Sequence, residues 1–200
     1  AQQVGFQEYL HAITEATARI QRLEQALRET LPDWSLRPCV QALQAMRGVQ
    51  LIAAMTLVAE LQDFLRFESA RKLMAYLGLV PGEHSSGPKR RQGSITKAGN
   101  STARRMLVEV AWHYQHSPRV SPIIATRQDQ LPEAITKIAW AAQLRLHAKF
   151  KRLLARRVMK NKAVVAVARE LAGFIWAIGC AVQTSGWQGI TVESAVTAAH

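Results

Sequence analysis

Apolar residues at helical spacing run through almost the whole chain and narrow the range of folds open to it. In the first thirty residues they recur at intervals of three, four and seven, at Phe6, Leu10, Ile13, Ile20 and Leu27. This seam is typical of a long amphipathic helix of the coiled-coil type, which Pro32 would end. The seam either pairs with a second helix or packs on the rest of its own chain.

No later segment alternates apolar and polar residues convincingly, so we expect an all-α protein. Residues 1–35 should form the coiled-coil-like helix, residues 36–185 a compact helical domain, and residues 186–200 a flexible tail. In the compact domain, start and stop signals predict helices through about residues 38–46, 69–77, 101–116, 133–159 and 162–182, with a further helix after Gly48.

The residues around Gly48 resemble a helix-hairpin-helix element. That pattern has a hydrophobic residue, Gly, a hydrophobic residue, Gly, three variable positions and Ala; here Gly48, Val49 and Ala54 match, and Gln50 replaces the second glycine. In such an element the backbone N–H groups of the turn bind a DNA phosphate. The alternative is a tight turn between two helices with no ligand.

Positive charge is concentrated in the second part of the chain. The formal net charge is +12, but residues 1–83 hold eight Lys and Arg against nine Asp and Glu, and residues 84–200 hold eighteen against five. Ten basic residues and no acid lie between Ala134 and Arg169. This asymmetry indicates a polyanionic partner, usually nucleic acid. An acidic membrane surface and a basic face that only keeps a scaffold soluble are the alternatives.

The stretch from His84 to Arg105 has six basic residues, no acid, and several glycines and hydroxyls, between two apolar helical patterns. Backbone N–H groups, hydroxyls and Arg side chains all donate to phosphate oxygens. A hydroxyl can also attack a phosphodiester, with nearby cations stabilising the developing charge. Chemistry alone does not choose among the candidates Ser85, Ser86, Ser94, Ser101 and Thr102, and a solvated basic loop is the simpler interpretation.

Other kinds of site are not indicated by the sequence. There is no Walker loop or dinucleotide fingerprint, and residues 84–108 hold no acid for a two-metal centre. Cys39 and Cys180 lack metal-binding spacing and are expected to be buried free thiols in a reducing cytoplasm. The longest apolar run, Leu171 to Val182, is too short to cross a bilayer, so we expect no membrane partner.

One block of residues carries a resemblance to a known family. It comprises Phe67, Tyr76, Gly78, Leu79, Pro81, Ser86, Gly87, Lys89 to Arg91, Ile95, Lys97, Gly99, Asn100 and Arg104 or Arg105. This block closely resembles the C-terminal transposase domain of the insertion-sequence "one-ten" family, which includes the one-sixteen and nine-hundred-and-two types. The similarity extends upstream to Gly48 and downstream into the last apolar helix.

The resemblance implies DNA transposition and recombination, with Ser86 as the nucleophile that joins covalently to a DNA strand and Ser85 as the alternative. It places nucleic-acid contacts at Gly48, Gly87, Lys89, Arg90, Arg91, Lys97, Asn100, Arg104 and Arg105. It also implies an upstream RuvC-like domain with four acids that bind magnesium, a structured guide RNA, a homo-oligomer and a bacterial, nucleoid-associated location. We expect this chain alone to be inactive; the alternative function is a helical module that binds nucleic acid without chemistry.

Overall fold

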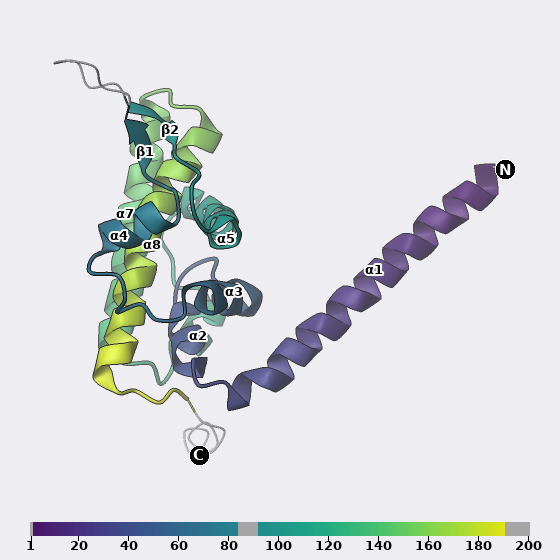
Figure 1. The fold of residues 1–200 in the computed structure, drawn as a ribbon, viewed down its shortest axis with the longest axis horizontal. Coiled ribbons are helices and arrows are strands. Elements are labelled where there is room, and N and C mark those ends of the chain that lie inside the picture. Colours follow the sequence, from purple (N-terminus) through teal and green to yellow (C-terminus); the bar gives the residue numbers. More distant parts are fainter. Residues whose placement is uncertain (1, 84–91, 191–200) are drawn as a thin grey trace. The chain divides into compact units, whose positions relative to one another are not determined.

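The computed structural model describes residues 2–83 and 92–190, and in them helices dominate (Figure 1). A two-stranded antiparallel sheet is the only sheet in this part of the chain. The prediction of an all-α protein with a long first helix is therefore confirmed. The chain divides into two compact units, Ala1–Arg37 and Pro38–His200.

The first unit is the helix α1 (Gln2–Thr30), followed by the short 3-10 helix η1 (Leu31–Asp33). The side chains of its apolar seam are exposed: 66% for Phe6, 64% for Ile13 and 57% for Ile20. The hydroxyls of Thr14 and Thr17 donate to the carbonyls four residues earlier, so these polar residues are satisfied within the helix.

The second unit contains the remaining helices. They are α2 (Arg37–Leu43), α3 (Leu51–Leu61), α4 (Ala70–Tyr76), α5 (Ser101–Ala111), the 3-10 helix η2 (Trp112–Gln115), α6 (Pro122–Gln128), α7 (Glu133–Ala155) and α8 (Lys160–Ser185). Side-chain oxygens cap three of them: Ser69 accepts from the N–H of Lys72, Asn100 from that of Ala103 and Ser121 from that of Ile124. A polar cap of this kind satisfies N–H groups that the helix itself leaves unpaired.

Helix α8 is the central helix of the second unit and packs against α4, α5 and α7 (Figure 1). Among the described helices, it alone is long and apolar enough to cross a bilayer, although only half of its most apolar stretch is buried in the protein. The uninterrupted apolar run from Leu171 to Val182 is only part of this helix, which has 26 residues. Its contacts with three other helices identify it as a core helix.

Three local features differ from the sequence predictions. Helix α6 was not predicted: a proline in a helical pattern usually ends a helix, yet Pro122 occupies the first turn of α6, where proline fits well. Helix α7 ends at Ala155 instead of Met159, and Arg157 there adopts a φ of +56°. Of the two free cysteines, Cys39 is buried but Cys180 is only half-buried.

The small sheet pairs β1 (Pro81–Glu83) with β2 (Gln92–Ile95), and its register places Pro81 opposite Ile95 and Glu83 opposite Gln92. Strands of three and four residues are too short to show an alternating pattern, so the sequence did not predict them. The candidates Ser85 and Ser86 fall in residues 84–91, outside the described residues, as do Gly87, Lys89, Arg90 and Arg91.

Candidate nucleic-acid site

Two glycines bring the chain after α4 against the chain before α5. Gly78 has a φ of +64° and Gly99 a φ of +81°, a region that favours glycine. A Cβ on Gly78 would meet the carbonyl oxygen of Ala98, and one on Gly99 would meet that of Tyr76, both well under 3.0 Å. Only glycine fits at either position, because the opposing atoms belong to the backbone and cannot turn away.

Hydrogen bonds hold this close approach together. The N–H of Thr96 donates to Val80 (2.9 Å), and that of Lys97 donates to Gly78 (3.1 Å). The guanidinium of Arg104 donates to the carbonyls of Leu77 and Ala98 at 2.9 and 3.3 Å. Residues 76–83 and 92–100 therefore form one locked unit, which we call the hairpin base.

Asn100 joins the hairpin base to α5. Its side-chain oxygen accepts from the N–H of Ala103 at 2.9 Å, and its amide nitrogen donates to the Glu60 carboxylate at 2.6 Å. The side chains of Asn100 and Arg104 thus have partners inside the protein, and we assign them the role of shaping this site. Their predicted contact with nucleic acid stays a prediction.

Lys97 and Arg105 are the predicted binding residues that are exposed in the described structure. Lys97 has a φ of +57°, uncommon for a residue with a side chain, and its backbone is held by the bond to Gly78. Strain of this kind often marks a functional position. The hairpin base therefore presents Lys97 in a fixed place.

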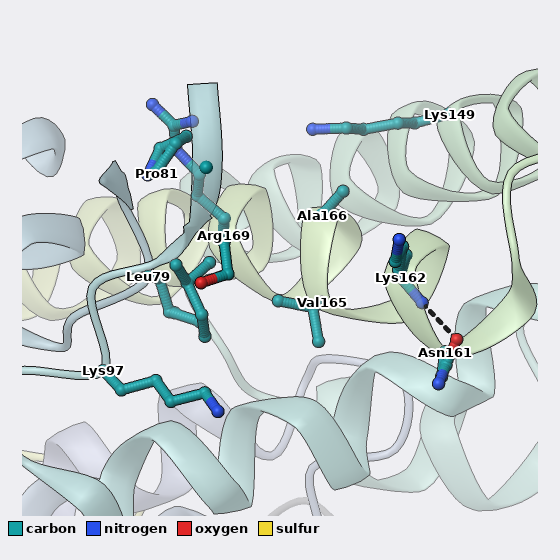
Figure 2. A pocket seen from close by; sticks show the side chains of 12 residues that line it. Leu79, Pro81, Lys97, Lys149, Asn161, Lys162, Val165, Ala166 and Arg169 are labelled. Atoms are coloured by element: carbon teal, nitrogen blue, oxygen red, sulfur yellow. Dashed lines mark hydrogen bonds between the residues drawn. The ribbon is translucent and has the colours of Figure 1, made fainter. Parts of the chain in front are cut away.

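A pocket of about 700 Å³ lies beside the hairpin base, and the first half of α8 forms its other wall (Figure 2). We call it the α8 pocket. Its lining includes the apolar side chains Leu79, Ile95, Val165 and Ala166 and the cations Lys97, Lys149, Lys162 and Arg169. The structure thus brings Lys97 together with three cations from the acid-free stretch at 134–169. Lys162 and Arg169 were not named as site residues from sequence, although that acid-free stretch contained them.

Glu170 neutralises part of this charge. Its carboxylate pairs with Lys149 at 2.8 Å and with Arg145. Burial acts to raise the pKa of Glu170, but the hydrogen bonds and charges of these two cations outweigh burial and lower it. No salt bridge to Lys97, Lys162 or Arg169 is found within residues 2–83 and 92–190, so these three side chains are available to an anionic ligand.

The turn at Gly48 lies elsewhere in the same unit, between α2 and α3. Gly48 has a φ of +79°, and a Cβ there would lie 2.6 Å from the ring of His113. Arg47 donates to the carbonyl of Ser117 at 2.6 Å, and Val49 is fully buried. Packing against η2 therefore accounts for this glycine without a ligand, and DNA contact at this turn stays a prediction.

The described residues offer no metal centre: no group of three or more His, Cys, Asp or Glu side chains is placed to hold an ion. His113, on η2, belongs to no such group within the described residues. The pKa of His113 is lowered by burial and by the charges of Arg47 and His116, which favours a neutral ring packed on Gly48.

Comparison with known proteins places this geometry in context. Residues 40–128 match a family model described as "Transposase IS116/IS110/IS902 family". A "Putative transposase y4qE" from Sinorhizobium fredii is 49% identical over 156 residues, which cover 78% of this chain and 40% of that protein.

Two further relatives are more distant. The "Transposase for insertion sequence element IS1111A" of Coxiella burnetii is 33% identical over 69% of this chain and 32% of its own length. The "Transposase for insertion sequence element IS1533" of Leptospira borgpetersenii is 26% identical over 78% of this chain and 45% of its own length. The chain thus spans less than half the length of each of these relatives.

Proposed function

Because the chain belongs to the IS116/IS110/IS902 family of transposases, we propose that it is the part of a transposase that binds DNA and supplies the serine that cleaves and rejoins it. The observation that carries this proposal is the meeting of Lys97, Lys162 and Arg169 beside the locked hairpin base. Among the residues that the structure describes, no acid forms a salt bridge with these three cations. A cluster of cations of this kind suits a phosphodiester backbone.

Ser86 is the proposed nucleophile. It lies in sequence between β1 and β2, whose pairing fixes Glu83 opposite Gln92. Both ends of the segment that carries Ser86 are therefore attached to neighbouring residues of the hairpin base. This attachment suits a reactive side chain, because catalytic groups are positioned most accurately on rigid structural elements.

The proposed reaction exchanges one phosphodiester for another. The serine oxygen forms a bond to phosphorus, the bond from phosphorus to a deoxyribose oxygen breaks, and that oxygen takes up a proton. The serine proton passes to water or to a base. Attack by a second strand's hydroxyl on the serine phosphoester reverses the process, so no external energy source is needed. Nearby cations stabilise the charge that develops on the phosphate.

Magnesium does not fit the described residues of this chain, because their acids form no cluster. We propose that an acidic, RuvC-like domain of the longer protein binds it, in keeping with the greater length of the relatives. A structured guide RNA, a homo-oligomer and association with the bacterial nucleoid are further parts of this proposal.

The alternative is a module that binds nucleic acid without chemistry. The described cations favour it equally, since phosphate binding needs no nucleophile. The two functions differ in whether a covalent protein–DNA bond forms.

The test is to trap that bond in the full-length protein with magnesium and its nucleic acids. Ser86→Ala should keep DNA binding, because one hydroxyl contributes only about 1 kcal/mol, but should lose the adduct and strand exchange. Ser85→Ala is the matched control and should keep DNA binding and at least part of the adduct formation and strand exchange. Mass spectrometry of the trapped species locates the linkage. An adduct on Ser85 would move the assignment by one residue, and recombination by Ser86→Ala would leave only the binding module.

A further inference from the structure

The α8 pocket has an apolar lining beside its cations, and binding of duplex DNA does not require such a lining. Phosphates on the outside of a duplex need only exposed cations, whereas this pocket also has an apolar lining from Leu79, Ile95, Val165 and Ala166. Its volume of about 700 Å³ lies in the range of cavities that enclose small organic groups. An apolar hollow bordered by cations fits a ligand that is flat and apolar in one part and anionic in another.

Along α8, the apolar side chains of the pocket lie between two cationic ones. Lys162 and Arg169 lie on either side of Val165 and Ala166, all facing the pocket (Figure 2). Seven residues of helix separate the two cations by about 10 Å along the axis. One apolar group between two anionic groups would match this arrangement.

Two polar groups can add selectivity. Asn161 accepts the N–H of Lys162 through its side-chain oxygen at 2.9 Å, and within the described residues no hydrogen bond engages its amide nitrogen. Ser94 is exposed at the opposite wall, on β2. An amide and a hydroxyl are groups that hydrogen-bond to the edge of a nucleobase.

The pocket is also formed before any ligand arrives. Backbone hydrogen bonds fix Lys97 and the hairpin base, and the ion pair with Glu170 fixes Lys149. A preformed pocket loses little ordering entropy on binding.

From these observations we infer that the α8 pocket takes one unpaired nucleobase of a DNA strand, while Lys162 and Arg169 bind the phosphates on its two sides. This inference rests on the proposed DNA-binding function and adds that the protein recognises a base outside the helical stack. Such a base is exposed wherever strands are opened or exchanged.

The test uses the 200-residue chain and three DNA probes of one sequence: a perfect duplex, the same duplex with one bulged thymidine, and the same duplex with a bulged abasic residue. The bulged thymidine should bind roughly fivefold to tenfold more tightly than the other two, near the low end of what a bound base contributes. Ala166→Trp, which fills the pocket, should remove this preference, so that the three probes bind this variant with equal affinity.

Ala141→Trp, at an exposed position of α7 outside the pocket lining, is the control and should retain the preference. If Ala166→Trp does not fold by circular dichroism, Ser94→Trp fills the pocket from the other wall. Equal binding of all three probes with a steep salt dependence would overturn the inference and leave the proposed function standing. If the filled variant still prefers the bulged thymidine, the base binds outside the α8 pocket and the inference is wrong. Absence of salt-dependent binding to every probe would remove the proposed function itself.

Discussion

Replacing Gly99 by alanine tests whether the hairpin base is locked as described. The new Cβ would meet the carbonyl oxygen of Tyr76, and the φ of +81° is unfavourable for alanine. The φ costs about 1 kcal/mol. Moving the backbone to relieve the collision weakens the bond from Asn100 N–H to Tyr76, now 3.3 Å, and adds about 1–3 kcal/mol. The expected loss of unfolding free energy is therefore about 2–4 kcal/mol.

Gly186→Ala is the matched control. Gly186 also has a positive φ, +67°, but a Cβ there would meet nothing within 4 Å. This variant should lose only about 1 kcal/mol, so the difference between the two variants isolates the collision. For a chain of this size each kcal/mol lowers Tm by roughly 2–4 °C, which gives about 5–15 °C for Gly99→Ala. Equal Tm values for the two variants in thermal unfolding would refute the locked hairpin base.

Two other predictions concern Glu170 and the seam of α1. The pKa of Glu170 is lowered in the folded protein, so its pairing stabilises the fold fully above its ordinary pKa of 4.5 and is lost as pH falls through the lower, folded value. Glu170→Gln should thus be less stable than the parent at about pH 7 in urea unfolding, and this difference should shrink as pH falls below 4.5. A difference that does not change with pH would contradict this. The seam side chains of α1 are exposed in the described part of the chain, so they are free to pair with a second helix. Changing Leu10, Ile13 and Ile20 to Asp should therefore abolish any dimer of the full protein in light scattering. An unchanged mass would count against pairing through α1.

Much of the helical fold followed from local sequence signals. The helices predicted at about residues 69–77 and 101–116 correspond to α4 and to α5 with η2. These signals act within a few residues, so they can be seen without the tertiary structure. Helix α6 was not predicted because a Ser-Pro pair is an ambiguous signal, which can end one helix or begin the next. Here Ser121 and Pro122 begin α6.

The site was only partly predictable from sequence. Lys97 stood out because it lies in a basic, glycine-bearing stretch, but its neighbours Lys162 and Arg169 are more than sixty residues away along the chain. Their meeting depends on the packing of the hairpin base against α8, which no local pattern encodes. Conversely, Asn100 and Arg104 matched the family motif, and the structure shows internal hydrogen bonds for both.

The most direct test of the central claim is the salt dependence of DNA binding by a variant with Lys97, Lys162 and Arg169 all changed to Ala. Each lost phosphate contact should flatten the slope of log K against log salt by about 0.9, so the triple variant should lose roughly two to three units. A control with the same loss of charge changes Arg19, Arg22 and Arg71, which are exposed and lie outside the pocket lining, and its slope should match the parent. Equal slopes for the two variants would show that net charge alone, and not this cluster of cations, governs DNA binding.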